Sequence, residues 1–191
     1  MPAGGKSRII FKFAKTVKTA IRENKKIIFA CIGSDRSTGD SLGPLVGHML
    51  TPRIRIHDEF EVVGTLKKPL HAMNMNEVLG KYSGEEYFMV AIDASLGRSE
   101  EVGNIVFRAE GLRPGAGVGK NLGVVGHVSI YGIVNVGSAL GMENMVLQST
   151  RLGLVYEMAQ EIVTIIMTGI YLSKSDNQLY MDLVETGSES R

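Results

Sequence analysis

The chain has 191 residues, of which 44% are hydrophobic and 21% charged, and its formal net charge is +1. This length and composition are typical of one globular domain that buries its own core. The small net charge excludes binding to nucleic acid or membranes through an overall field. The single cysteine, Cys31, excludes an intramolecular disulfide and is compatible with a reducing compartment.

The first segment is predicted to form an amphipathic helix. Apolar residues recur every four positions from Ile9 to Ile21, which places them on one side of a helix. Residues 1–26 carry eight Lys or Arg and one Glu, so the opposite side is basic. We expect the apolar side to pack on a sheet and the basic side to face solvent.

Beyond this helix, strand and helix patterns alternate. Continuous apolar runs predict strands at 27–32, 60–66, 87–92, 103–108 and 128–136. Helical patterns occur at 45–50, 75–81 and 143–172, and the last is expected to bend at Gly153 or to divide in two. This alternation predicts one α/β sandwich.

The domain limits are predicted from the same patterns. We expect a disordered start at 1–7, one domain at 8–172 and a peripheral tail at 173–191. Lysines interrupt the N-terminal apolar stretch, so it lacks the core of a signal peptide. The late apolar run at 162–172 is too short to span a bilayer. A cytoplasmic location follows, with no membrane partner and no direct nucleic-acid signal.

Two acidic segments that follow apolar strands contain the main candidate site. Residues 33–44 include Asp35 and Asp40, and residues 91–97 include Asp93. Open α/β sheets build their sites at the carboxyl ends of strands, so these carboxylates are expected to meet in one crevice. The first segment lacks both the P-loop ending and the G-x-G-x-x-G spacing, and its aspartates would repel phosphate.

The chemistry of these carboxylates is open at this point. Two facing carboxylates would have one pKa raised, which makes Asp40 and Asp93 a candidate acid/base pair. Alternatively, a divalent cation could be held by both and lower the pKa of a bound water. Asp40 could instead cap the helix that follows it, and Asp35 could satisfy loop amides.

Several segments together resemble the YyaC-type sporulation protein family, over roughly residues 26–170. They are residues 33–44, Gly64-Thr-Leu66, His71-Ala72, residues 91–97, Pro114-Gly-Ala-Gly-Val-Gly-Lys120, Gly132-Ile-Val-Asn135 and Leu147-Gln-Ser-Thr-Arg-Leu152. That family resembles the germination protease that degrades small acid-soluble spore proteins and, more distantly, the hydrogenase maturation proteases. The resemblance implies a phosphorylase/hydrolase-like three-layer αβα sandwich with a mostly parallel central sheet, and a peptidase lineage.

The resemblance also implies roles for individual residues. Asp40-Ser-Leu-Gly-Pro44 and Ile92-Asp-Ala94 match the segments that hold the proposed catalytic aspartates of the germination protease. The loop at 114–120 is similar to a Pro-Gly-Ser-Gly-Val-Gly segment of that protease, whose amides could bind a carbonyl or oxyanion. The residues expected to bind substrate or tune the pair are Asp35, His71, Gly115, Gly117, Gly119 and Lys120.

A metal site is implied by the more distant relatives. Maturation proteases use a carboxylate pair and a histidine to hold the metal of their substrate. The corresponding candidates for a divalent metal ion are Asp40, Asp93 and His127, the last of which lies just before a predicted strand.

The leading hypothesis is a sporulation- or germination-associated peptidase-like hydrolase, in which Asp40 and Asp93 activate water for peptide-bond hydrolysis. Its substrate would be a protein or peptide, with small acid-soluble spore proteins as candidates, and the chain could form a homo-oligomer. One alternative is a non-catalytic binding or regulatory protein on a peptidase scaffold. Another is a metal-sensing protease of the maturation type.

Overall fold

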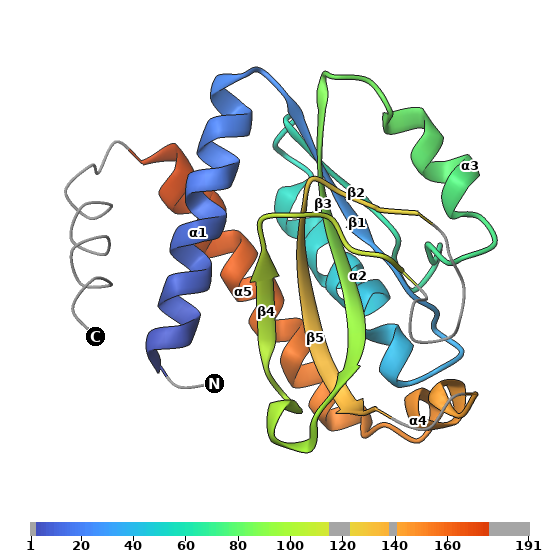
Figure 1. Cartoon of the computed structure of the whole chain (residues 1–191). Helices are drawn as coiled ribbons and strands as arrows, with labels where there is room; N and C mark the ends of the chain where they lie inside the picture. Colours follow the sequence, from blue (N-terminus) through green and yellow to red (C-terminus); the bar gives the residue numbers. More distant parts are fainter. Residues whose placement is uncertain (1–2, 115–122, 138–140, 176–191) are drawn as a thin grey trace.

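A computed structural model of the chain describes residues 3–114, 123–137 and 141–175 (Figure 1). Its centre is a five-stranded sheet in the order β2-β1-β3-β5-β4. The strands are β1 (Lys26–Cys31), β2 (Phe60–Val63), β3 (Tyr87–Gly97), β4 (Ile105–Arg108) and β5 (Val128–Val136). All neighbouring strands are parallel except β4, which runs antiparallel to β5. The sheet is therefore mostly parallel, as predicted.

Helices cover both faces of the sheet, which confirms the predicted αβα sandwich. Helices α1 (Ala3–Arg22), α2 (Leu42–Ile54) and α5 (Leu152–Lys174) contribute to the core on one face, and α3 (Met75–Leu79) contributes to the core on the other. The remaining elements are α4 (Glu143–Gln148) and the 3-10 turns η1 (Gly39–Ser41), η2 (Gly80–Tyr82) and η3 (Ser99–Glu101).

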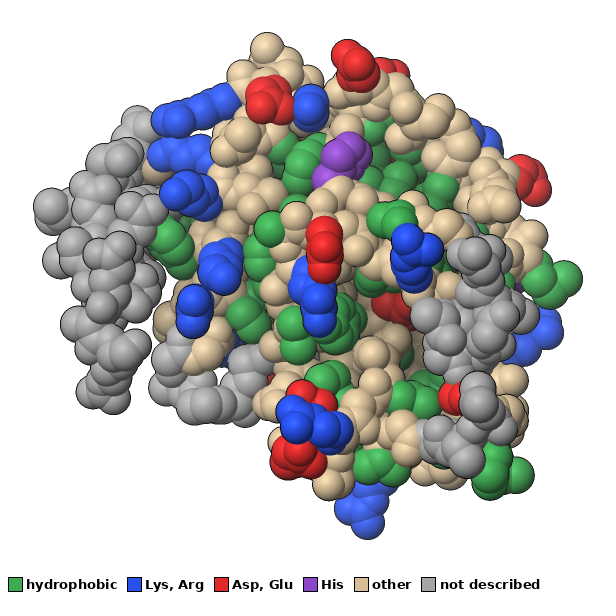
Figure 2. All heavy atoms as spheres, viewed as in Figure 1, with side chains coloured by type: hydrophobic (Ala, Val, Ile, Leu, Met, Phe, Trp, Pro, Cys, Tyr) green, Lys and Arg blue, Asp and Glu red, His purple; other side chains and the backbone are tan. Residues whose placement is uncertain are grey.

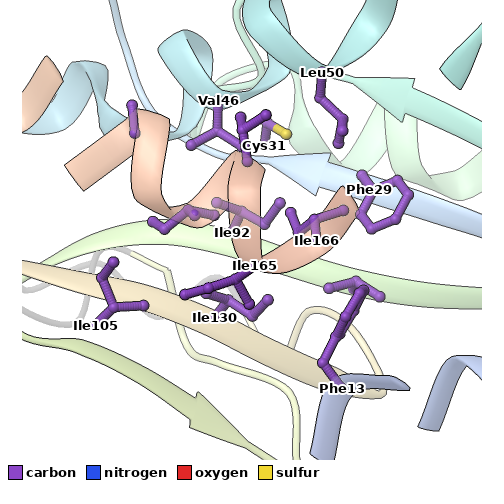
Figure 3. Packing of buried hydrophobic residues seen from close by; sticks show 14 of the residues in the cluster. Phe13, Phe29, Cys31, Val46, Leu50, Ile92, Ile105, Ile130, Ile165 and Ile166 are labelled. Carbon is purple, nitrogen blue, oxygen red and sulfur yellow. The ribbon is translucent and has the colours of Figure 1, made fainter. Parts of the chain in front are cut away.

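The continuous apolar run of β1 is explained by burial on both sides. Phe29 and Cys31 point to the core beneath α1, α2 and α5, whereas Ile28 and Ala30 point to the core beneath α3. On the larger side, Phe13 of α1 lies 6.4 Å from Phe29, measured between ring centroids (Figure 3). Burial raises the pKa of the Cys31 thiol, so this cysteine is a packed apolar residue rather than a reactive thiol.

Helix α1 confirms the amphipathic prediction. Phe13 and Val17 are fully buried, while Arg8 and Lys12 are exposed. Lys and Arg side chains accordingly gather along α1 on the surface (Figure 2). The helix begins at Ala3 and ends at Arg22.

The long helical pattern near the C-terminus divides in two, as one of the two expectations had it. Helix α4 ends at Gln148, and α5 runs from Leu152 to Lys174. Helix α5 is the one described helix long and apolar enough to cross a membrane by length and composition, but half of its most apolar window is buried in the fold. It is the central core helix, with Ile162, Ile165 and Ile166 inaccessible to solvent.

Candidate functional site

The candidate site lies where successive strands switch from one side of β1 to the other. From β1 the chain passes through α2 to β2 on one side, and then through α3 to β3 on the other side of β1. Such a switch in strand order leaves an opening at the carboxyl ends of the two central strands. A pocket of about 740 Å³ occupies this position, and we call it the crevice. Its lining comes from the segments after β1 and β2, the end of β3, the segment after β4, and α4.

Asp40 reaches the crevice from a tight turn after β1. Gly33 has a φ of +138°, a conformation that L side chains rarely adopt, and it begins this turn. The Ser34 N–H donates to the backbone carbonyl of Asp40 at 3.1 Å, which closes the turn. Asp40 lies inside η1, and the N-cap of α2 is Ser41. The alternative in which Asp40 caps α2 is therefore not the arrangement found.

Asp93 reaches the same crevice from within β3. Pairing between β1 and β3 ends at Cys31 and Ile92, whereas β3 continues to Gly97 and, among the described strands, pairs there with β5 alone. Asp93 is thus the first β3 residue beyond the end of β1, and its Oδ1 accepts the N–H of Ala94 at 2.8 Å. The expected loop after Ile92 is a strand instead, but Asp93 still lines the crevice with Asp40.

The two carboxyl groups interact electrostatically. Burial raises the pKa of Asp93 well above its ordinary value, and the negative charge of Asp40 raises it further. Burial also raises the pKa of Asp40, while the Ser34 amide and His71 act in the opposite direction. The two carboxyl groups together therefore hold a proton more readily than an isolated aspartate does. We call these residues the Asp40–Asp93 pair.

His71 lines the crevice from the segment after β2. Its backbone N–H donates to Asn74 Oδ1 at 2.9 Å, which holds the loop that carries it. Its ring Nδ1 is buried and has no hydrogen-bond partner among the described residues. Ser37 Oγ, from the segment after β1, is in the same situation and lines the same crevice. Asp35 lies exposed at the crevice, where it was expected.

His127 lies in a different pocket, which corrects the predicted metal set. Its Nδ1 accepts the N–H of Met89 at 2.9 Å, and its ring stacks on Phe88 with centroids 4.9 Å apart. It lines a second pocket of about 530 Å³, which we call the α3 pocket, formed with Met75, Leu79, Gly80, Tyr82 and Met89. Across residues 3–114, 123–137 and 141–175, no three His, Cys, Asp or Glu side chains gather as metal ligands.

Comparison with known proteins places the chain in a family. Residues 4–165 match the family described as a protein of unknown function, DUF1256. The chain belongs to this family. The uncharacterized protein YyaC of Bacillus subtilis strain 168 is 45% identical over 154 residues, which cover 76% of this chain and 73% of YyaC. This supports the predicted YyaC-type family.

A solved structure was also found to be similar. It is a NiFe hydrogenase maturation protease, HycI, from Thermococcus kodakarensis, with a TM-score of 0.44 and 14% sequence identity. The match covers 80% of this chain and 99% of that chain.

The glycine-rich loop predicted to bind substrate lies outside the described residues. It contains Gly115, Gly117, Gly119 and Lys120, whose roles stay predictions. Pro114, the residue before it, lines the crevice.

Three cationic side chains also line the crevice. Lys67 and Arg113 line the crevice beside Arg36, and none of the three makes an ion pair with a described residue. Arg113 follows a segment that crosses the sheet face covered by α3. There Leu112 forms an isolated antiparallel β-bridge with Val125. No local pattern signals that crossing, so the place of Arg113 at the crevice was not predictable.

Proposed function

We propose that the chain is a peptidase-like hydrolase whose Asp40–Asp93 pair activates water against a peptide carbonyl. The observation that carries this proposal is the meeting of two charge-coupled carboxyl groups, from separate strand-end segments, in one crevice of about 740 Å³. A crevice of this size suits a short peptide segment or a small molecule. The family resemblance favours the peptide.

The influences on the two pKa values suggest which carboxyl group acts as the base and which as the acid. Asp40, whose carboxylate is favoured by the Ser34 amide and His71, accepts a proton from water as the water oxygen bonds to the peptide carbonyl carbon. Asp93, which retains its proton, donates it as the carbon–nitrogen bond breaks, and the amine leaves. The pair ends with its proton on Asp40, and transfer back to Asp93 restores the starting state. Hydrolysis requires one proton on the pair, so its rate should fall on both the acidic and the basic side.

A resident metal is no part of this mechanism. His127, the predicted third ligand, is committed to Met89 and Phe88 in the α3 pocket. The crevice therefore offers two carboxylates without a clustered third ligand among the residues that the structure describes. Such a donor set does not fit a stable protein-held catalytic metal, which usually has three protein ligands.

The first substrates to try follow from the resemblance. YyaC-type proteins resemble the germination protease, so small acid-soluble spore proteins are the first protein substrates, beside a pool of random peptides. A sporulation or germination role and a place in the spore interior belong to this proposal.

The test is hydrolysis by the purified chain and two substituted forms. Asp40→Asn and Asp93→Asn are each expected to lower peptide cleavage by about 10²–10⁴-fold, as for loss of a general acid or base. Asp58→Asn is the matched control, because Asp58 is exposed in the loop before β2, at the opposite end of that strand from the crevice. Cleavage products are identified by mass spectrometry. If the unsubstituted chain cleaves no more than Asp93→Asn across pH, the hydrolase proposal is wrong and a binding role is favoured.

A further inference from the structure

Among the residues that the structure describes, the edge of β3 that faces the crevice has no partner strand beyond Ile92. On the β1 side, the carbonyl of Ile92 accepts the N–H of Ile32 at 2.7 Å, and on the β5 side, the carbonyl of Met89 accepts the N–H of His127 at 2.8 Å. Backbone groups of alternate strand residues point to opposite neighbours. The backbone of Ala94, two residues after Ile92, therefore faces the β1 side, where pairing has already ended.

The hydrogen bond of the Ala94 amide reflects this missing partner. Its N–H donates to the side chain of Asp93, at 2.8 Å from Oδ1, rather than to a neighbouring strand. Its carbonyl faces the same gap. Asp93, Ala94, Ser95 and Leu96 all line the crevice, and no strand among the described residues covers this short edge. Proteins usually cover, shorten or charge a free strand edge, because such an edge pairs readily with another chain.

Two residues that line the crevice each have a buried polar atom without a partner among the described residues. Ser37 Oγ and His71 Nδ1 are the buried side-chain atoms without a hydrogen bond among the described residues, and both belong to crevice-lining side chains. Buried polar atoms are nearly always hydrogen-bonded in native proteins, so two unpartnered ones in crevice-lining residues mark this part of the fold as unusual. A peptide backbone carries both donors and acceptors.

We propose that the crevice binds its substrate as an extended peptide that adds a strand to the open edge of β3. The inference rests on the proposed function for the hydrolysis that follows binding. It defines the substrate class as an unfolded or flexible peptide segment. Main-chain bonds along this edge, beginning at the free carbonyl of Ala94, would supply affinity with little dependence on sequence. They would also place a peptide carbonyl beside Asp93, the residue before Ala94. Apolar side chains at the crevice, among them Leu66, Met73 and Leu147, would contact alternate side chains of the peptide.

The test measures which peptide amides are needed for binding. Immobilised Asp93→Asn protein, whose amide oxygen can still accept the Ala94 N–H, is used to retain peptides from a random decapeptide pool. The best retained peptide is resynthesised with a single N-methyl group at each backbone nitrogen in turn. We expect methylation at alternate residues to weaken binding by about three- to tenfold, since each removes one main-chain hydrogen bond. Methylation at the residues between them, which keeps every side chain, is the matched control.

A second measurement locates the bound peptide on the protein. Amide hydrogen exchange in residues 94–97 should slow when the same peptide is added, while exchange in residues 105–108 of β4 should not change. An unchanged rate in 94–97, a methylation profile without alternation, or failure to retain any peptide would each overturn strand addition.

The outcomes for binding and for hydrolysis are separable. If the alternating profile is found but the unsubstituted chain does not cleave the retained peptide, strand addition stands and the hydrolase proposal fails. If the peptide is cleaved but the profile is flat, the hydrolase proposal stands and strand addition fails.

Discussion

The crevice and the α3 pocket each contain a histidine, and the two histidines are used in opposite ways. In the α3 pocket, His127 has its Nδ1 bonded to the Met89 amide and its ring stacked on Phe88. In the crevice, His71 has a buried Nδ1 without a partner among the described residues. A satisfied polar group holds structure together, whereas an unsatisfied buried one is costly to keep.

The titrating groups of the two pockets differ in the same sense. Tyr82 of the α3 pocket has a pKa raised to about 12 by burial and by its hydrogen bond to Glu61, at 2.6 Å. That shift only keeps a hydroxyl protonated that is already protonated at neutral pH. In the crevice, the pKa values of Asp40 and Asp93 move up from the acidic range, which brings carboxyl groups toward the pH at which acid/base chemistry operates.

The largest expected effect on stability comes from substituting Gly33, the glycine that shapes the crevice. A Cβ at Gly33 would lie 1.9 Å from the backbone oxygen of Asp40, at a φ of +138°. Gly33→Ala must therefore displace the turn that carries Asp40, and we expect a loss of about 3 kcal/mol or more in the free energy of unfolding. Urea unfolding followed by circular dichroism measures this loss.

The matched control for that substitution lies in the α3 pocket. A Cβ at Gly80 would meet nothing within 4 Å, and its backbone is right-handed helical. Gly80→Ala should leave stability unchanged or raise it by about 0.4–1 kcal/mol, by restricting the unfolded chain. Equal losses for both substitutions would show that the Gly33 turn is not the constrained element described above.

The next effect is a gain in stability when Asp93 is made neutral. The folded chain holds a proton on Asp93 more tightly than the unfolded chain does, because burial and Asp40 raise its pKa. Its contribution to stability is therefore complete below the unfolded pKa and is lost as pH rises through the folded pKa. Asp93→Asn should raise the melting temperature at neutral pH, by about 2–4 °C for each kcal/mol gained.

This gain should depend on pH and be specific to the crevice. The difference in melting temperature between the unsubstituted chain and Asp93→Asn should shrink as pH falls below the ordinary aspartate range. There the side chain at position 93 is neutral in both forms. Asp58→Asn, on the exposed loop before β2, should show no such gain. A gain that is equal at acidic and neutral pH would contradict the charge interaction within the Asp40–Asp93 pair.

The strand and helix positions were largely predictable, because burial on both faces leaves a local pattern. The predicted strand at 128–136 has the bounds of β5, and the run at 27–32 differs from β1 by one residue at each end. The crevice followed from the same patterns, since parallel strands bring the segments after them to one edge. On that basis, Asp40 and Asp93 were predicted to lie in one crevice.

What could not be predicted depends on pairing between distant segments. Nothing in Ala94–Gly97 indicates a strand, and β3 continues there only because β5, more than thirty residues later, pairs with it. The open edge beyond Ile92 can be recognised only when the pairing of β3 with β1 and with β5 is known. His127 was likewise misassigned, because its contact with Met89 depends on the register between β3 and the chain entering β5.

The smallest expected effect tests the two histidines directly. His127→Ala removes the bond to the Met89 amide and the stacking on Phe88, so we expect a loss of about 1 kcal/mol in unfolding free energy and unchanged peptide hydrolysis. His71→Ala removes a side chain whose buried Nδ1 has no described partner, so the free energy of unfolding should not fall, while peptide affinity and hydrolysis do. Urea unfolding and peptide binding, measured on both forms, separate these effects. The opposite result, with hydrolysis lost in His127→Ala and retained in His71→Ala, would move the working histidine to the α3 pocket.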